Sequence, residues 1–256
     1  MAKSKYSILF EDNDIVVIDK PAGMLTIPDR FSPAENLRAL LTSKYGQIFV
    51  VHRLDRETSG VLVFAKNADA HRNLSIQFEN HTVTKIYSAV ISGQLAEDEL
   101  SIDIPLMPDP VHKGLMRPSA RGKDSLTIMK VIERYRIATH VECDLRTGRQ
   151  HQIRVHSASI GHPLLVDSLY GKSEAFLLST IKRRYNLQKN EEEKPIISRI
   201  TLHSKTLGFK HPSTGADVEF TSELPKDFKA LLSVLRKYSA IPTITNKFQN
   251  SFKTIQ

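Results

Sequence analysis

Residues 51–66 read VHRLDRETSGVLVFAK, and this stretch joins a polar loop to an apolar run. The loop places Asp55 between Arg53 and Arg56, and the small residues of a turn follow it. The run VLVFA is short, rich in β-branched and aromatic residues and preceded by turn residues, which is typical of a buried strand. Another short strand is predicted at 48–51, so we expect the loop with Asp55 to connect two elements of a sheet.

Strand patterns extend from this stretch toward both ends of the chain. Four further segments show the alternation or the turn residues of antiparallel strands. These segments are 6–24, 85–93, 125–145 and 203–220. In KIYSAVISG (85–93), the alternation places Tyr87, Ala89 and Ile91 on one face of the strand.

Three segments have the features of helices. Residues 32–46 have Ser32 in the N-cap position, a stripe of leucines and Gly46 as the stop signal. Residues 67–80 predict a second helix, and RTGRQHQIRVHSASIGHP (146–163) predicts a third that ends at a glycine and a proline.

The chain is therefore expected to have an α+β fold, with a mixed, mainly antiparallel sheet and flanking helices. We expect one domain over residues 1–235 and a basic tail over 236–256, which holds four Lys/Arg and no acid. Residues 106–123 are rich in Pro, Gly and basic residues and predict a mobile loop, and 182–194 predict an exposed charged insertion.

The charge of the chain favours a polyanionic partner. The formal net charge is +8, and residues 110–156 hold ten Lys/Arg against four Asp/Glu, a local excess of +6. Basic side chains that neutralise phosphates release condensed counterions, so this excess suits nucleic acid, although a solubilising surface explains it equally well. The only cysteine, Cys143, excludes an internal disulfide. With no apolar signal core at the N-terminus, we expect a cytoplasmic protein.

Several chemistries lack their motifs. The chain has no GxGxxG, no Walker A sequence and no GxSxG around Ser59. His151 and His156 are five residues apart, which is not the i, i+4 spacing of a helical zinc site. Cys143 alternates with Val141 and Leu145, which is typical of a buried hydrophobic position. We therefore expect no metal and no cofactor.

Asp55 is the carboxylate that this pattern singles out. Its arginine neighbours favour the ionised form, which makes it a poor proton acceptor and suits it to nucleophilic attack or to the stabilisation of positive charge. The alternative is an ordinary loop aspartate in a surface ion pair.

The motif HRLDRETSGVLVFAK closely resembles the signature of the RluA-type pseudouridine synthases, which isomerise uridine in RNA. Four other segments resemble the remaining motifs of this family in the same order. They are VVIDKPAGM, KIYSAVISG, DLRTGRQHQIRVHSASIGHPLLVDSLYG, and LHSKTLGFKHPSTGADVEF with ELPKDF. The resemblance implies the pseudouridine synthase fold with a central cleft, an RNA substrate and no cofactor or metal. It also implies that this chain lacks an upstream RNA-binding domain, because the motifs begin within its first twenty residues.

The resemblance also assigns roles by position. Asp55 matches the catalytic aspartate, Tyr87 the tyrosine that packs on the target base, and Arg154 the arginine that pairs with the aspartate. Leu145 matches the apolar residue of the uracil pocket, and Arg53 the arginine that enters the RNA stack. The remaining residues expected to bind substrate are Arg56, Thr58, Arg149 and His151.

Some alternatives stay open. Attack of Asp55 on ribose C1′ or on uracil C6, and a glycal route with Tyr87 as base, are all chemically possible. The RNA is ribosomal or transfer RNA, and a monomer is expected because the motifs of one chain supply every residue expected in the site. The competing functions are a non-catalytic RNA-binding protein and a hydrolase that pairs Asp55 with Asp167 as its second carboxylate.

Overall fold

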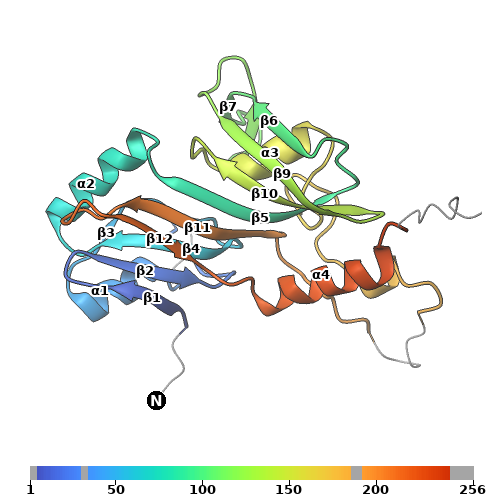
Figure 1. Cartoon of the computed structure of the whole chain (residues 1–256), viewed down its shortest axis with the longest axis horizontal. Helices are drawn as coiled ribbons and strands as arrows, with labels where there is room; N and C mark the ends of the chain where they lie inside the picture. The colour runs from blue at the N-terminus through green and yellow to red at the C-terminus, as the bar shows by residue number, and fades with distance from the viewer. Residues whose placement is uncertain (1–4, 30–33, 186–191, 243–256) are drawn as a thin grey trace, which may run out of the picture.

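The structure is a computed structural model that describes residues 5–29, 34–185 and 192–242. A ten-stranded sheet runs through it in the order β1-β2-β4-β11-β5-β10-β9-β6, with β12 beside β11 and β3 beside β4 (Figure 1). Its strands are β1 (Ser7–Glu11), β2 (Ile15–Lys20), β3 (Phe49–Val50), β4 (Ser59–Ala65), β5 (Thr84–Ser92), β6 (Glu99–Asp103), β9 (Leu126–Arg134), β10 (Ala138–Leu145), β11 (Leu202–Lys210) and β12 (Asp217–Thr221). The pair β4 and β11 is parallel and the other pairs are antiparallel, so the predicted mixed, mainly antiparallel sheet is confirmed.

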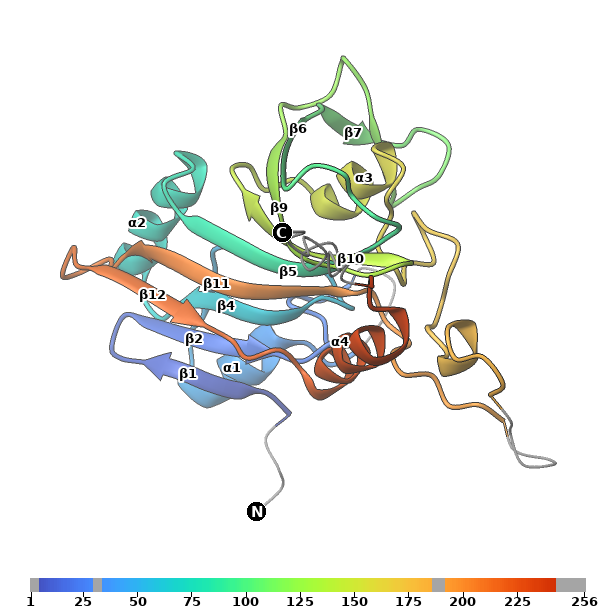
Figure 2. The same ribbon diagram turned by 45° about the vertical axis from the view of Figure 1, so that its right-hand side comes forward.

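Helices cover both faces of the sheet, and the side chains of its central strands alternate between the two layers. The helices are α1 (Leu37–Tyr45), α2 (Ala68–Glu79), α3 (Gln152–Ser159) and α4 (Lys226–Ser239), with a short 3-10 turn at Leu178–Thr180. Ile18 of β2 packs in one core with Leu41 of α1, and its neighbour Val17 packs in another with Leu74 of α2. In a third core, α4 packs against Val90 of β5 (Figure 2).

The first helix begins later than its sequence predicts. Asn36 is the N-cap of α1, and its side-chain oxygen accepts a hydrogen bond from the backbone N–H of Ala39 at 3.0 Å. The predicted N-cap, Ser32, lies outside the described residues, and the helical segment starts only at Leu37. The predicted stop at Gly46 is confirmed. Gly46 is the C-cap with φ of 79°, and its N–H donates to the carbonyl of Thr42. The shift has a local reason, since the asparagine side chain caps the helix as a serine would.

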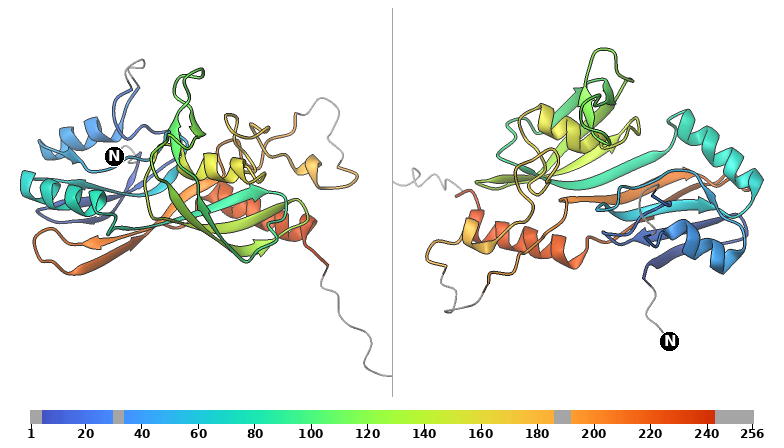
Figure 3. Two further views of the ribbon diagram at one scale, coloured as in Figure 1. Left: turned by 90° about the horizontal axis from the view of Figure 1, so that it is seen from above. Right: turned by 180° about the vertical axis from the view of Figure 1, so that it is seen from behind.

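Residues 106–123 are not the mobile loop that their composition predicts. Strands β7 (Leu106–Pro108) and β8 (Met116–Pro118) pair in a small hairpin that projects from the sheet beside α3 (Figure 3). Gly122 packs directly on the backbone of Leu106, where a Cβ atom would lie 2.6 Å from the carbonyl carbon. The glycine and prolines of this stretch therefore shape a hairpin.

The boundary predicted at residue 235 falls inside α4, which runs on to Ser239. Sequence reasoning missed this helix although the signal was present. Phe228, Leu231, Leu232 and Leu235 recur at helical spacing, and all four are buried. Only part of the predicted tail, 236–242, belongs to the described residues. Residues 186–191 of the predicted insertion also lie outside them.

Candidate active site

The loop that carries Asp55 is held in place by backbone contacts from the N-terminal part of the chain. The hydroxyl of Thr26 donates to the carbonyl of Leu54 at 2.9 Å and accepts from the N–H of Leu54 at 3.2 Å. The carbonyl of Arg56 accepts from the N–H of Gly23 at 2.9 Å and from the ammonium of Lys20 at 3.0 Å. Asp55 therefore lies between two anchored residues.

Lys20 is a buried lysine beneath this loop. Its ammonium also donates to the carbonyls of Pro21 and Met24, at 3.0 and 2.8 Å. Burial lowers the pKa of Lys20 to about 7, against the attraction of Glu57 and Asp55. Three carbonyl acceptors thus fix the ammonium at the turn that aims Asp55.

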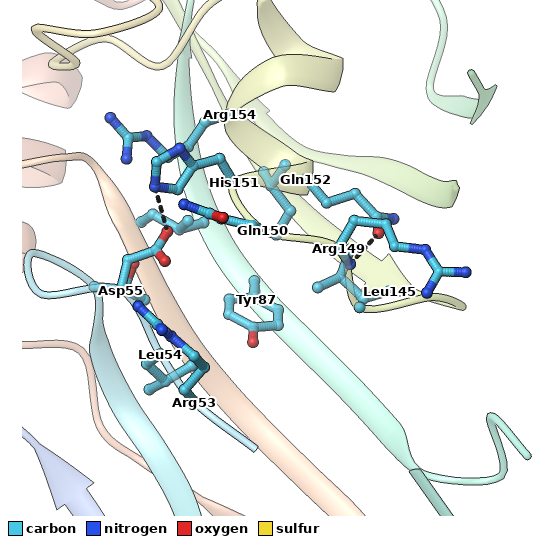
Figure 4. A pocket seen from close by; sticks show the side chains of 14 residues that line it. Arg53, Leu54, Asp55, Tyr87, Leu145, Arg149, Gln150, His151, Gln152 and Arg154 are labelled. Atoms are coloured by element: carbon cyan, nitrogen blue, oxygen red, sulfur yellow. Dashed lines mark hydrogen bonds and ion pairs between the residues drawn. The ribbon is translucent and has the colours of Figure 1, made fainter. Parts of the chain in front are cut away.

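Asp55 faces a cavity of about 200 Å³ between the loop, β5, β10 and the start of α3 (Figure 4). Among the described residues that line this cavity, Asp55 is the only acid. Leu54, Leu145 and Leu202 supply apolar surface, and the rings of Tyr87 and His151 add to it. The full lining is Arg53, Leu54, Asp55, Thr58, Tyr87, Leu145, Gly148, Arg149, Gln150, His151, Gln152, Ile153, Arg154 and Leu202.

His151 is the ring that the structure places beside Asp55, with 3.7 Å between Nε2 and Oδ2. It stands in the N-cap position of α3 with φ of 54°, and its Nδ1 is hydrogen bonded to the hydroxyl of Tyr170 at 2.8 Å. Burial lowers the pKa of His151, although the charge of Asp55 opposes this. A neutral imidazole therefore lies beside the carboxylate at neutral pH.

Arg154 does not pair with Asp55 as the family resemblance led us to expect. Its guanidinium forms two parallel hydrogen bonds to Asp167, both 2.7 Å long, and both side chains are buried. Asp167 also accepts the N–H groups of Leu169 and Tyr170, at 2.9 and 3.1 Å. Burial raises the pKa of Asp167, but Arg154 and these donors outweigh it, so the pKa is lowered overall.

This pairing argues against the two-carboxylate hydrolase. A general acid must hold a proton near neutral pH, whereas Asp167 is ionised and fully occupied by donors. Its role is to anchor Arg154, whose guanidinium lies 5.0 Å from the ring centroid of Tyr170. Tyr170 in turn contacts His151, so the pair supports the residue beside Asp55.

Tyr87 lies in the cavity wall on β5 and is almost fully buried. Burial raises the pKa of Tyr87 to about 12, while a hydrogen bond with Ser204 lowers it and the charge of Asp55 raises it. The phenol is therefore protonated at neutral pH. It can pack on a base and donate a hydrogen bond, but it accepts a proton only after losing its own.

The remaining predicted residues divide into two groups. Arg53, Leu145, Thr58 and Arg149 line the cavity as expected. Arg56 does not line it, because its Nε donates to the carbonyl of Gly23 at 3.1 Å and its guanidinium lies 3.7 Å from Glu57. The side chains of a loop have no regular direction along the sequence. The motif alone therefore could not show that Arg53 lines the cavity and Arg56 does not.

Gln152 is a structural residue of the site that sequence reasoning missed. Its side-chain oxygen accepts the N–H of Arg149 at 2.9 Å and the hydroxyl of Thr147 at 2.8 Å. Its amide nitrogen donates to the carbonyl of Leu126 and the hydroxyl of Thr127, both at 3.0 Å. Gln152 thus fixes the turn from which Arg149 and His151 project.

The β7-β8 hairpin is also attached to the site. The side-chain amide of Gln150 donates to the carbonyl of Gly114 at 3.2 Å, and the N–H of Met116 donates to the hydroxyl of Tyr170 at 2.8 Å. Residues near 115 and 150 are too far apart in sequence for pattern reasoning to link them.

A group that could ligate a metal occurs elsewhere, at Asp12, Asp14 and His211. Asp12 accepts the N–H groups of Asp14 and Ile15, both at 2.8 Å, and its other oxygen is 2.8 Å from Nε2 of His211. These contacts account for the group as the support of the β1-β2 turn. None of the three residues lines the cavity.

Comparison with known proteins gives one consistent family. Residues 14–159 match the family model described as RNA pseudouridylate synthase. An uncharacterised RNA pseudouridine synthase of Bacillus subtilis is 38% identical over 239 residues, which cover 90% of this chain and 73% of the relative. The ribosomal large subunit pseudouridine synthase D of Pseudomonas aeruginosa is 36% identical over 236 residues, which cover 90% and 72%. Among solved structures, human RNA pseudouridylate synthase domain containing 4 shares the fold, with a TM-score of 0.67, 24% identity and coverage of 90% and 92%.

Proposed function

Because this chain belongs to the RNA pseudouridine synthase family and is thus an isomerase, we propose that it converts a uridine of ribosomal RNA to pseudouridine with Asp55 as the catalytic carboxylate. The observation that carries the proposal is the cavity, in which Asp55 is the only acid among the described lining residues. The ribosomal substrate is supported by relatives named for the large ribosomal subunit, at 36% identity. Transfer RNA is the competing substrate.

The reaction requires the uridine to leave the RNA stack and then to turn. Breaking the N1–C1′ bond and rejoining through C5 demands that the detached uracil is retained. Leu145 and the ring of Tyr87 line the cavity and supply apolar surface for this base, and we assign Arg53, another lining residue, to the gap that the uridine leaves in the RNA. Flipping costs a few kcal/mol, which contacts between the basic rim and phosphates offset.

Asp55 can act in three chemical routes. These are attack on ribose C1′, attack on uracil C6, and assistance to removal of the C2′ proton. Each route uses an ionised carboxylate enclosed in the cavity, where its charge is screened less than in bulk water and acts more strongly on the reacting atoms. A neutral His151 beside it leaves the negative charge available. The high pKa of Tyr87 disfavours the phenol as the primary base of the glycal route.

The remaining residues support this arrangement. Arg154 and Asp167 hold Tyr170, and Tyr170 holds His151 against Asp55. We assign Arg154 as a positioning residue, since its own charge is neutralised by Asp167. Arg149 and Thr58 line the cavity and serve substrate binding.

We also propose that the protein acts as a monomer in the cytoplasm. All the groups that we assign to the reaction come from this chain, so the proposal requires no residue of a second copy. The buried, unpaired thiol of Cys143 fits a reducing compartment. No helix among the described residues is long and apolar enough to cross a membrane. An equilibrium molecular mass of two chains would contradict the monomer.

The first test is tritium release from RNA labelled at C5 of uridine, with ribosomal and transfer RNA compared. We expect wild-type protein to release tritium from ribosomal RNA, and Asp55→Asn to abolish release while RNA binding is kept. The matched control is Asp217→Asn, which removes a carboxylate that is 85% exposed and far from the cavity lining. Full activity of Asp55→Asn would overturn the proposed role, and release from transfer RNA alone would reassign the substrate.

A further inference from the structure

A second groove of about 590 Å³ opens directly from the cavity. The two share five lining residues, which are Arg53, Tyr87, Leu145, Gly148 and Arg149. Beyond this shared part, the groove is bounded by His52, Phe78, Glu79, His81 and Lys85. An RNA strand whose target base occupies the cavity can therefore continue into this groove, which runs along β5 toward the end of α2.

Lys85 forms the floor of this groove. It precedes Tyr87 by two residues on β5, so the two side chains share a face, about 7 Å apart along the strand. The residue is only 6% exposed, and its ammonium lies 5.9 Å from the ring centroid of Phe78. Within the described part of the chain, this ammonium makes no hydrogen bond and no ion pair.

The Nζ atom of Lys85 reaches the open groove, because it is not one of the fully enclosed unpaired atoms of the described residues, but the surrounding protein removes much of its hydration. This partial burial has a cost in free energy, since no protein acceptor replaces the lost water. Burial lowers the pKa of Lys85, while Asp144 raises it and Arg146 lowers it further. The cost is removed when an anion with hydrogen-bond acceptors meets the ammonium. A lysine held in this way is prepared for a ligand that the free protein does not contain.

The surroundings select the class of that anion. Arg53 and Arg149 flank the groove, and Glu79 is its only acid among the described lining residues. His52 and Phe78 stack at 4.5 Å and form an aromatic wall. Burial and the charge of Lys85 lower the pKa of His52 to about 3, so its ring is neutral, and its Nε2 accepts the N–H of Val63 at 3.3 Å. An aromatic wall with cations on one side fits a nucleotide, whose base is apolar on its faces and whose phosphate is anionic.

We propose that this groove holds the nucleotide next to the target uridine, and that Lys85 bonds its phosphate between Arg53 and Arg149. The inference rests on the proposed function, because it assumes that the flipped uridine occupies the cavity beside Tyr87. The separation of Lys85 and Tyr87 along β5 is one that a single nucleotide step spans. Lys85 is thus a residue for substrate binding, distinct from the groups that act on the uracil.

The test combines Lys85→Gln with a neutral linkage in the RNA. The substrate is an oligonucleotide with the target uridine, prepared either with phosphates throughout or with one methylphosphonate at each flanking position in turn. We expect Lys85→Gln to raise KM and Kd by about 10- to 100-fold with little change in kcat, as for loss of one charge-assisted hydrogen bond. The slope of log Kd against log salt should fall by about 0.7, as for one phosphate of a single strand.

The phosphate that Lys85 contacts is found by combining the variant with each methylphosphonate and asking whether their effects on Kd add. One methylphosphonate should weaken binding to the wild type by a similar factor, and should weaken binding to Lys85→Gln no further. Lys85→Arg should recover most of the affinity, because it restores a cation at the same place. Lys229→Gln is the matched control, since it removes one exposed lysine charge on α4 outside the groove.

Two outcomes would overturn the inference. One is an unchanged Kd for Lys85→Gln, and the other is a methylphosphonate effect that adds fully to the variant at every position. Folding is checked with Lys85→Met, whose melting temperature should fall little. The ammonium has no hydrogen bond or ion pair to lose among the described residues, and its contact with the ring of Phe78, at 5.9 Å, is weak. If the wild type isomerises no uridine, the proposed function fails, and binding of the same oligonucleotides still decides the phosphate contact.

Discussion

At the scale of single residues, the site places one carboxylate beside His151, Tyr87 and Arg154, which are neutral or already paired, while Arg53 and Arg149 also line the cavity. Burial keeps His151 unprotonated by lowering its pKa and keeps Tyr87 protonated by raising its pKa. Arg154 is neutralised by Asp167. Asp55 is therefore the only negative charge among the described lining residues, and the partial exclusion of water from the cavity strengthens its effect on a uridine.

A substitution at Tyr87 distinguishes two roles of its side chain, packing on the base and proton transfer. Tyr87→Phe keeps the ring that contacts the base and removes only the hydroxyl, so we expect KM to stay within about 3-fold. If the hydroxyl moves a proton in the reaction, kcat should fall by about 10²- to 10⁴-fold. Steady-state kinetics on the isomerised RNA separates the two parameters. A KM that rises as much as kcat falls would show that the hydroxyl serves binding instead.

At the scale of elements, the approach of β4 to β11 sets the end of the catalytic loop. Gly60 is the second residue of β4 and has a φ of +116°, and a Cβ atom there would lie 2.0 Å from the backbone oxygen of Ser204. Ser204 is its partner in the parallel register of β11. Only glycine permits this contact, so the sheet geometry that holds the loop depends on one missing side chain.

Gly60→Ala should therefore destabilise the fold by at least about 3 kcal/mol, because backbone must move to admit the methyl group. Urea unfolding followed by circular dichroism measures the loss. Gly46→Ala is the control, since Gly46 also has a positive φ of +79° but nothing lies within 4 Å of its Cβ position. We expect it to cost about 1 kcal/mol. Equal costs for the two variants would rule out the close contact as the cause.

At the scale of the whole molecule, buried histidines make stability depend on pH. His140 lies in the interior, where burial and the charge of Arg236 lower its pKa to about 4. In the unfolded chain the same group takes up a proton near pH 6.5. The stability that His140 contributes is therefore complete above pH 6.5 and is lost as the pH falls toward 4.

We expect His140 alone to remove about 2 kcal/mol from the free energy of unfolding between pH 7 and pH 5. Urea unfolding at the two pH values measures this difference. In His140→Gln the difference should shrink by that amount, because the side chain no longer titrates. His112→Gln is the control, since that histidine is 68% exposed. A slope unchanged by His140→Gln would contradict the prediction.

The sequence by itself determined the sheet, the Asp55 loop and the family. Alternation shows which strand faces are buried, because side chains of a strand point to opposite sides in turn. The sequence also contained the helical spacing of α4, which our sequence analysis missed, in Phe228, Leu231, Leu232 and Leu235. The motif around Asp55 resembles the family signature, and the match to the family model over residues 14–159 confirms the family.

Only the tertiary structure decided which side chains meet. Arg154 pairs with Asp167, His151 stands beside Asp55, and Arg56 turns away from the cavity. The groove over Lys85 likewise joins α2, β5 and the turn before α3, which are distant in sequence. Such contacts depend on how strands and loops are arranged in space. A local pattern of residues does not give the direction of a side chain in a loop. It also does not give the partner that another element supplies.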